Sequence, residues 1–233
     1  MRRHLTFLAA LCLAVPAAPG ATRADDGRLK DAELVLTEMA GSFDTGIPKS
    51  LFNKARCVVI IPGVKKAALG IGGQYGRGYI SCRLDQPNSA NAAAPVVPSR
   101  WSAPGGIRVE GGSVGLQIGG SETDVILLVM NQRGVDRLLT NNFKVGADAA
   151  VAAGPVGREA TAQTDITMRA EMLAWSRSRG VFAGLSLQGS TLRDDSGENK
   201  ELYGREIDNK EVITGKIAVP KSAENLMKAL SKF

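Results

Sequence analysis

The chain has 233 residues, a formal net charge of +6 and a hydrophobic content of 44%, values that suit one large globular domain. Aromatic residues make up only 5% of the chain and no nucleic-acid recognition motif occurs, so nucleic acid is not an expected partner. The single histidine is His4, at the extreme N-terminus. If an N-terminal leader is cleaved, the mature chain has no histidine. It then cannot hold a Ser-His-Asp triad, a Cys-His pair or a histidine metal site, and we expect no cofactor and no metal.

The N-terminus has the pattern of a secretory signal peptide, predicted for residues 1–24. Two arginines precede an apolar stretch of eleven residues, 5–15, and small residues then suit cleavage before Asp25. Cys12 lies inside the apolar stretch rather than after it, which argues against a lipoprotein. We therefore expect an exported protein, located in a periplasm or outside the cell and peripheral to a membrane.

Cleavage leaves residues 25–233, predicted to form a single domain. The formal charge falls from +6 to +3, because the leader carries three arginines and no acidic residue. No later stretch approaches the roughly 18 apolar residues of a membrane span, so no transmembrane helix is expected in the mature chain.

Hydrophobic periodicity predicts a helix at each end of the mature chain. Apolar side chains recur at helical spacing in residues 27–42. Residues 220–233 predict an amphipathic segment with a helix over 221–232, whose apolar face either lies on a membrane or packs on the domain itself. Shorter helices are expected after Pro48 and at 133–141.

Alternating and continuous apolar runs between these helices predict strands. We expect strands at 57–61, 68–84, 106–130, 147–153, 165–177 and 180–193. The first is expected to stop at Pro62-Gly63, and the second to turn at its glycines; a helix is an alternative for 165–177. The predicted fold class is α+β, with a glycine-rich, mostly antiparallel sheet or incomplete barrel flanked by N- and C-terminal helices.

The stretch RVEGGSVGLQIGGSETD, residues 108–124, fits three templates. It contains the G-x-S-x-G pattern of a hydrolase elbow around Ser113, and glycines four apart as in a membrane helix dimer. The charges on both sides exclude a lipid-spanning helix, while the missing histidine and the alternation that continues through Ser113 exclude the elbow. The glycines therefore serve architecture, and we expect no catalytic residues and no enzyme activity.

Five motifs occur in a fixed order: GVKKAALGIGGQYGRGYISCR, WSAPGGIRVEGGSVGLQIGGSETDVILLVMN, AAGPVGREA, WSRSRGVFAGLSLQGSTLR and LYG. In this order and spacing, over about residues 30–215, the chain resembles the SYLF domain family of lipid-binding proteins.

The resemblance implies a binding domain with no known catalysis. Eukaryotic members are associated with phosphoinositide membranes and with actin, and bacterial members are mostly exported. We carry over lipid binding but not actin binding, since an exported protein does not meet cytoplasmic actin. The alternative function is a structural or stress-related envelope protein that binds another protein rather than lipid.

A basic stretch supports the lipid hypothesis. Between residues 49 and 108 there are nine basic residues and one acid, Asp85. Such a stretch attracts an anionic membrane surface, unless it is a solvated face whose acids lie elsewhere in the fold. The predicted lipid-binding residues at expected turns are Lys65, Lys66 and Arg77. Arg83 and Arg100 are predicted to join them if the loop at 85–99 folds back toward that end.

The mature chain keeps two cysteines, Cys57 and Cys82, in an exporting context. Both fall in predicted strands, so they are either a disulfide or two buried small residues. A bridge requires their Cα atoms to lie within about 7 Å of each other.

Overall fold

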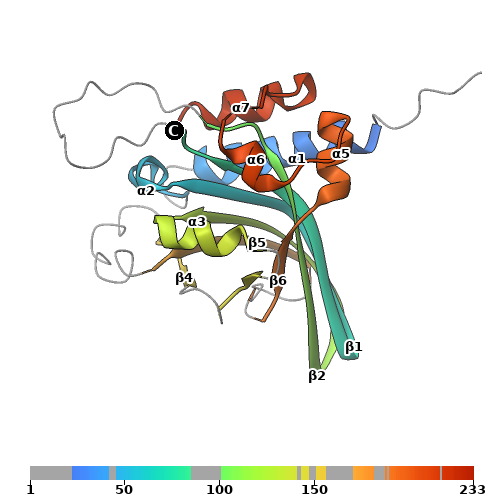
Figure 1. Ribbon diagram of the computed structural model, residues 1–233. Helices are drawn as coiled ribbons and strands as arrows, with labels where there is room; N and C mark the ends of the chain where they lie inside the picture. Colours follow the sequence, from blue (N-terminus) through green and yellow to red (C-terminus); the bar gives the residue numbers. More distant parts are fainter. Residues whose placement is uncertain are drawn as a thin grey trace, which may run out of the picture.

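Two antiparallel strands of exceptional length organise the fold (Figure 1). They are β1 (Cys57–Cys82) and β2 (Gly105–Val129), whereas most strands have about 3–10 residues. The computed structural model describes residues 23–41, 46–84, 101–140, 143–146, 151–155, 170–180, 187, 189–215 and 217–233.

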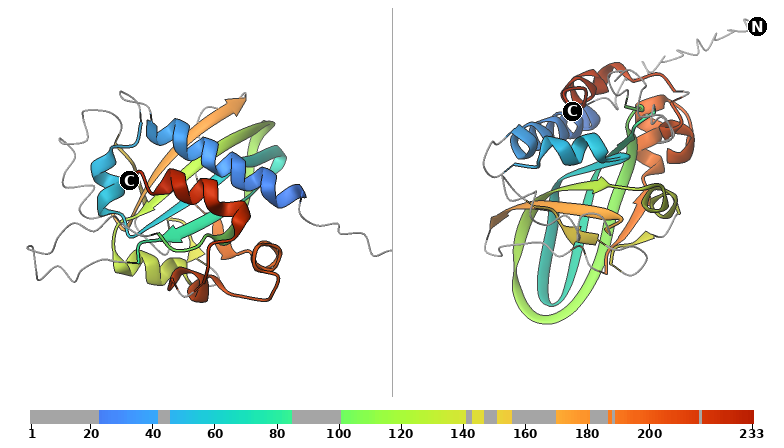
Figure 2. Two further views of the ribbon diagram at one scale, coloured as in Figure 1. Left: turned by 90° about the horizontal axis from the view of Figure 1, so that it is seen from above. Right: turned by 90° about the vertical axis from the view of Figure 1, so that its left-hand side faces the viewer.

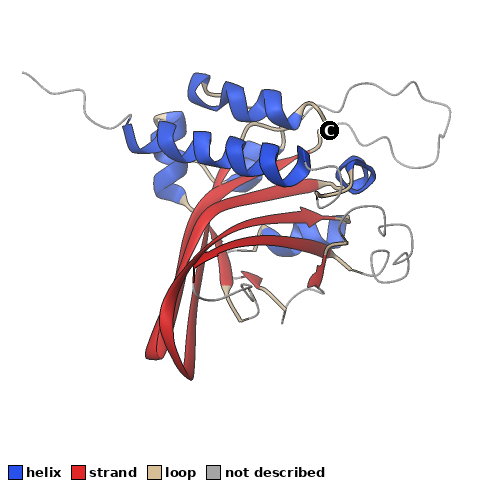
Figure 3. Cartoon of the chain, turned by 180° about the vertical axis from the view of Figure 1, so that it is seen from behind, coloured by secondary structure: helices blue, strands red, loops and turns tan. Residues whose placement is uncertain are grey.

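The remaining strands attach to the two halves of β2. Its second half pairs with β5 (Met172–Gly180), which β4 (Val151–Ala153) joins in parallel. Its first half pairs with β6 (Thr191–Asp194), and β3 (Phe143–Lys144) extends that side. The described strands thus form one six-stranded, mostly antiparallel sheet. With helices packed on it, this sheet confirms the α+β prediction (Figure 3).

The β1–β2 ribbon folds back on itself near its middle, which curls the sheet (Figure 2). At the bend β2 has three residues, 115–117, where β1 has only Gly70, as expected for the outer and inner strands of a curve. The two halves of β1 are thereby brought together. A Cβ atom at Gly78 would lie 2.0 Å from the carbonyl oxygen of Ile60, so only glycine fits at this position.

The prediction that Pro62-Gly63 stops the first strand is wrong, because β1 continues through it as a bulge. Pro62 and Gly63 of β1 lie there opposite one residue of β2, Asp124, so β1 has one extra residue. Gly63 takes a left-handed conformation (φ 57°), and its N–H donates to Asp124 Oδ1 over 3.0 Å. The side chain of Asp124 therefore accepts the hydrogen bond that a backbone carbonyl of β2 would otherwise accept from Gly63. This contact lets β1 continue past the proline.

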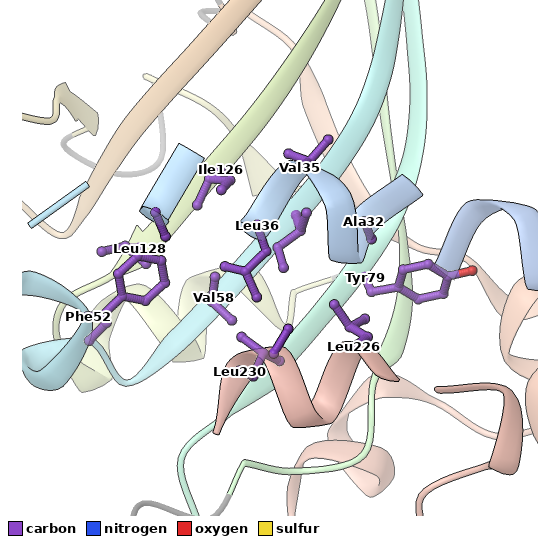
Figure 4. Close-up of a cluster of buried hydrophobic side chains, with 14 of the residues drawn as sticks. Ala32, Val35, Leu36, Phe52, Val58, Tyr79, Ile126, Leu128, Leu226 and Leu230 are labelled. Carbon is purple, nitrogen blue, oxygen red and sulfur yellow. The ribbon is translucent and has the colours of Figure 1, made fainter. Parts of the chain in front are cut away.

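Curling gives the ribbon a core on each face. The inner core lies within the curl, and its buried side chains include Val59, Ile61, Ile80, Val109, Leu127 and Met172. The outer core lies between the sheet and the helices, and Figure 4 shows Ala32, Leu36, Phe52, Val58, Ile126, Leu128, Leu226 and Leu230 packed there. The apolar run at 125–129 supplies both cores alternately, so this part of β2 is buried on both faces.

Helices α1 (Arg23–Gly41) and α7 (Glu224–Leu230) lie side by side over the outer core (Figure 2). A 3₁₀ turn (Lys221–Ala223) leads into α7, so both terminal helices are confirmed. Because Leu226 and Leu230 are buried, the C-terminal helix packs on its own domain with its apolar face.

The shorter helices are partly predicted. α2 (Lys49–Lys54) and α3 (Gln132–Leu138) occur where expected. α5 (Ser196–Tyr203) and α6 (Asn209–Ile213) were not predicted, although Asp195 and Asp208 cap their first turns with side-chain hydrogen bonds.

The predicted strands at 106–130 and 165–177 correspond to β2 and β5, so the helical alternative for the second is wrong where it is described. Residues 165–169 lie outside the described part. The glycine-rich turn expected within 68–84 is instead a bend within the continuous strand β1. The strands expected at 147–153 and 180–193 are described only in part, as β4 and β6.

Cys57 and Cys82, at the two ends of β1, are joined by a disulfide with Cα atoms 4.0 Å apart. The bond therefore links the beginning of the folded ribbon to its end. Both cysteines belong to the inner core and are at most 5% exposed.

We predict that Gly78→Ala lowers the free energy of unfolding by about 2–3 kcal/mol, because the new methyl group meets the backbone of Ile60 and cannot be avoided by a rotamer change. The control is Gly112→Ala, where the nearest atom is 4.0 Å away and the change is neutral or slightly stabilising. Urea denaturation of both variants measures the difference. Equal stabilities would contradict the close contact between the halves of β1.

Candidate functional site

The cations predicted to bind lipid do not form one cluster. Lys65 and Lys66 are neighbours on β1, so their side chains leave opposite faces of the sheet. Lys65 is exposed and Lys66 is half-buried. Arg100 lies outside the described residues.

Arg77 lies within β1 rather than at a turn, which corrects the expectation that it projects freely. Its guanidinium pairs with Asp195, and its Nη2 lies 3.1 Å from Glu198 Oε2. Two carboxylates therefore already neutralise this arginine.

Arg77 is also the first of three arginines in a row across the sheet. It stands opposite Arg108 of β2, which stands opposite Arg193 of β6. Glu110 lies beside the second and third, with 3.0 Å from Oε1 to Arg108 Nε and 3.8 Å from Oε2 to Arg193 Nε. With acids at every position, the row is a balanced network rather than a cationic patch.

Arg83 has a structural role. It donates to the backbone oxygens of Ala55, Phe52 and Phe233 over 2.9–3.0 Å, and its guanidinium lies 4.4 Å from the ring centroid of Trp101. Burial lowers the pKa of Arg83. The side chain thus ties the C-terminal residue to α2 and to the end of β1.

A different group of cations lies where α2 meets the end of α7. The ring of Phe52 in α2 stacks on that of Phe233 with centroids 4.5 Å apart, which holds the two segments together. Four lysines on these segments are exposed, and we call them the lysine surface: Lys49, Lys54, Lys228 and Lys232.

The lysine surface has little opposing charge in the described part of the chain. None of its four lysines forms an ion pair with another described residue. α2 contains no acidic residue, and the only one in α7 is Glu224, at the other end of that helix. Lys54 and Lys228 lie in last helical turns, where a cation also favours the helix itself. The four lysines are therefore accessible cations, and the nearest exposed acids on a neighbouring helix are those of α1, which lies beside α7.

A buried carboxylate holds the helical layer to the sheet. Glu198 of α5, only 1% exposed, accepts hydrogen bonds from Arg28 of α1 and from the hydroxyl of Tyr79 of β1. With Arg77 also near, one side chain connects α1, α5 and the ribbon.

The same network shifts ionisation equilibria. The hydrogen bond that Arg77 donates to Asp195 raises the pKa of Arg77 further above its usual range. Burial opposes ionisation of Asp195, but the hydrogen bonds from Arg77 and from the Glu198 amide outweigh it and lower the pKa of Asp195 below its ordinary value. Since the folded pKa is the lower one, this carboxylate stabilises the fold at neutral pH, and its contribution is lost as the pH falls below about 4.

Sequence reasoning missed the lysine surface as a unit. Lys49 and Lys54 were counted in the basic stretch, but Lys228 and Lys232 lie about 180 residues later. The available signal was the polar side of the C-terminal helix, whose lysines recur four residues apart.

We predict that Glu198→Gln lowers the free energy of unfolding by about 2–4 kcal/mol, because Arg28 and Arg77 lose their shared counter-charge in a buried site. The matched control is Glu206→Gln, which removes an exposed pair with Lys200 (2.8 Å) and costs at most about 1 kcal/mol. Chemical denaturation of the two variants checks this. A loss for Glu198→Gln no larger than the control's would show that the network carries no stability.

Within the described residues, no helix is both long and apolar enough to traverse a bilayer. The chain is 32% identical over 188 residues to an SH3 domain-containing protein of Schizosaccharomyces pombe, covering 79% of this chain and 41% of that protein. It is 29% identical over 191 residues to the SH3 domain-containing YSC84-like protein 1 of Bos taurus, covering 82% and 52%. It is 30% identical to the protein YSC84 of Saccharomyces cerevisiae, covering 80% and 38%.

The chain spans about half or less of the length of these relatives. The Ysc84 family, described as Las17-binding protein actin regulator, matches residues 110–233, more than half of the chain. This match, with the named relatives, confirms the SYLF resemblance. The chain belongs to the Ysc84/SYLF family.

Proposed function

We propose that this protein is a non-catalytic, peripheral binder of anionic phospholipid, and that it docks on the membrane through the lysine surface. The observation that carries the proposal is four exposed lysines on two adjoining segments with no described acidic partner. Arg77 and Arg177, by contrast, are held in ion pairs.

The energetics suit reversible attachment. Each lysine near an anionic membrane surface contributes about 1 kcal/mol, so four contribute roughly 4 kcal/mol. This amount is enough for salt-dependent binding and too little for permanent anchoring. The charges are screened over about 8 Å at physiological salt, so they act only when the surface approaches the headgroups closely.

The packing of α7 decides its orientation. Its apolar residues Leu226, Ala229 and Leu230 are buried against the domain, so they are not available for insertion into lipid. The exposed side of the helix carries Lys228 and the following turn carries Lys232. In this proposal the helix therefore contacts headgroups with its polar side. Lys65 and Lys66, which leave opposite faces of β1, are not part of this surface and stay a separate prediction from the sequence.

We predict that Lys49→Gln combined with Lys232→Gln weakens binding to vesicles of phosphatidylserine and phosphatidylcholine about tenfold or more, since two contacts of about 1 kcal/mol are lost. Co-sedimentation at increasing salt measures the effect, and binding of the unaltered protein falls as salt rises.

The control combines Lys200→Gln with Lys210→Gln, an equal change of charge on exposed lysines of α5 and α6. Equal losses in both double variants would mean that net charge alone governs binding. A third variant, with Lys65 and Lys66 replaced by glutamine, tests the cations expected from the sequence. Vesicle binding that survives loss of Lys49 and Lys232 would refute the lysine surface.

The family description supports an alternative in which the partner is a protein. It names Las17 binding and actin regulation, and several relatives are named as SH3 domain-containing. For an exported chain the corresponding role is structural or stress-related binding within the cell envelope. Absence of vesicle binding at low salt favours this alternative.

Export is part of the proposal, and the cysteines support it. A disulfide between Cys57 and Cys82 persists in an oxidising compartment such as the periplasm. It closes a loop of 25 residues, and such a bond typically adds about 2–4 kcal/mol of stability.

We predict that protein recovered from the bacterial envelope without reductant shows no alkylation of Cys57 or Cys82 by iodoacetamide in denaturant, and two alkylations after reduction. Intact-mass spectrometry gives both values. Two alkylated cysteines in the unreduced sample would refute both the bond and its use as support for export.

A further inference from the structure

A groove of about 560 Å³ runs between α1 and the β1–β2 ribbon. None of the four lysines of the lysine surface lines it. One wall is formed by α1, which contributes Asp31 and Leu34. The other is formed by the ribbon, which contributes Lys65, Tyr75 and Glu122. The groove is therefore bounded by two rigid elements that share the outer core.

Both walls expose a large apolar side chain. Leu34 is 47% exposed and Tyr75 is 50% exposed, whereas most large apolar side chains of the described residues are buried. Among these residues, only Val219 is a further large apolar side chain with comparable exposure, and it does not line the groove. Exposed apolar groups facing a common recess, with polar groups around them, are typical of an interaction site.

The charges around this apolar pair are of two kinds. The three arginines of the groove are held in ion pairs. Arg28 pairs with Glu198, and Arg77 pairs with Asp195 and Glu198. Arg177 pairs with Glu38 and Asp124. Three exposed charges form no ion pair with another described residue: Asp31, Lys65 and Glu122.

Two of these three charges balance each other. Lys65 and Glu122 stand opposite each other across the strand ladder, so their charges offset. Asp31 then remains as an uncompensated charge on the α1 wall, and Arg177, a single cation between Glu38 and Asp124, leaves a second negative charge in excess. The groove thus presents two apolar side chains beside a net negative charge.

We propose that this groove binds an extended segment of a partner protein in which a large apolar side chain lies next to a lysine or arginine. The apolar side chain contacts Leu34 and Tyr75, and the cation pairs with Asp31. An aromatic or aliphatic anchor with an adjacent complementary charge is a common basis of peptide recognition. The site shares no residue with the lysine surface, so the proposal does not depend on lipid binding.

The test uses the mature protein and a short synthetic peptide in which one leucine is flanked by two lysines within a glycine–serine sequence. Titration of ¹⁵N-labelled protein is expected to shift the amide signals of residues 31–38 and 62–65. A peptide with serine in place of leucine, and one with glutamates in place of the lysines, are each expected to bind about tenfold more weakly or not at all.

Two variants locate the contacts. Tyr75→Ser removes one apolar wall and Asp31→Lys reverses the uncompensated charge, and each is expected to weaken peptide binding about tenfold. The matched control is Val219→Ser, which removes an apolar group of similar exposure outside the groove. Thermal unfolding verifies that all three variants are folded.

Equal binding of the leucine and serine peptides would overturn the apolar contact, and an equal effect of Val219→Ser would overturn the location. No shift with any of the peptides would overturn the proposal as a whole. Self-association of the unlabelled protein through this groove, seen as the same shifts on increasing its concentration, would show that the occupant is a second copy instead.

Discussion

The structure depends on the contact between the two halves of β1. At Gly78 the strand approaches its own earlier segment so closely that no side chain fits against Ile60 and Ile61. This contact closes the curl of the ribbon and encloses the inner core. It also leaves the opposite face free for α1 and α7, while Cys57 and Cys82 join the ends of the strand. The glycines are thus a geometric requirement of the curl.

The proposed functional surfaces follow from this arrangement. Because the ribbon is curled, its outer face needs a cover of helices, and that cover brings α2 beside the last residues of the chain. The stacking of Phe52 on Phe233 and the anchor of Arg83 fix this junction, on which the lysines are displayed. The same cover places Leu34 of α1 opposite Tyr75 of the ribbon and so creates the groove. Glu198 of α5 joins α1, one wall of this groove, to the ribbon.

The fold class and the terminal helices could be predicted from the sequence, because periodic apolar residues directly report burial. The continuity of β1 could not, since Pro62-Gly63 is an ordinary stop signal unless the side chain of Asp124, 61 residues away, accepts the glycine amide. Arg77 was predicted to be exposed because it lies between two glycines, which are an ordinary signal of a turn. Its pairing with Asp195 depends on a strand register that local sequence does not encode. The lysine surface likewise joins segments that meet only in the folded chain.

The most direct measurement of the central constraint is a nuclear Overhauser spectrum of the folded protein. The Cα atom of Ile61 lies 2.7 Å from the position that a Cβ atom at Gly78 would occupy. The account therefore predicts a cross-peak between the α-protons of Gly78 and the backbone protons of Ile61, although the two are not paired in the strand ladder. A well-resolved spectrum that contains the β1–β2 ladder contacts but lacks this cross-peak would contradict the folded-back ribbon.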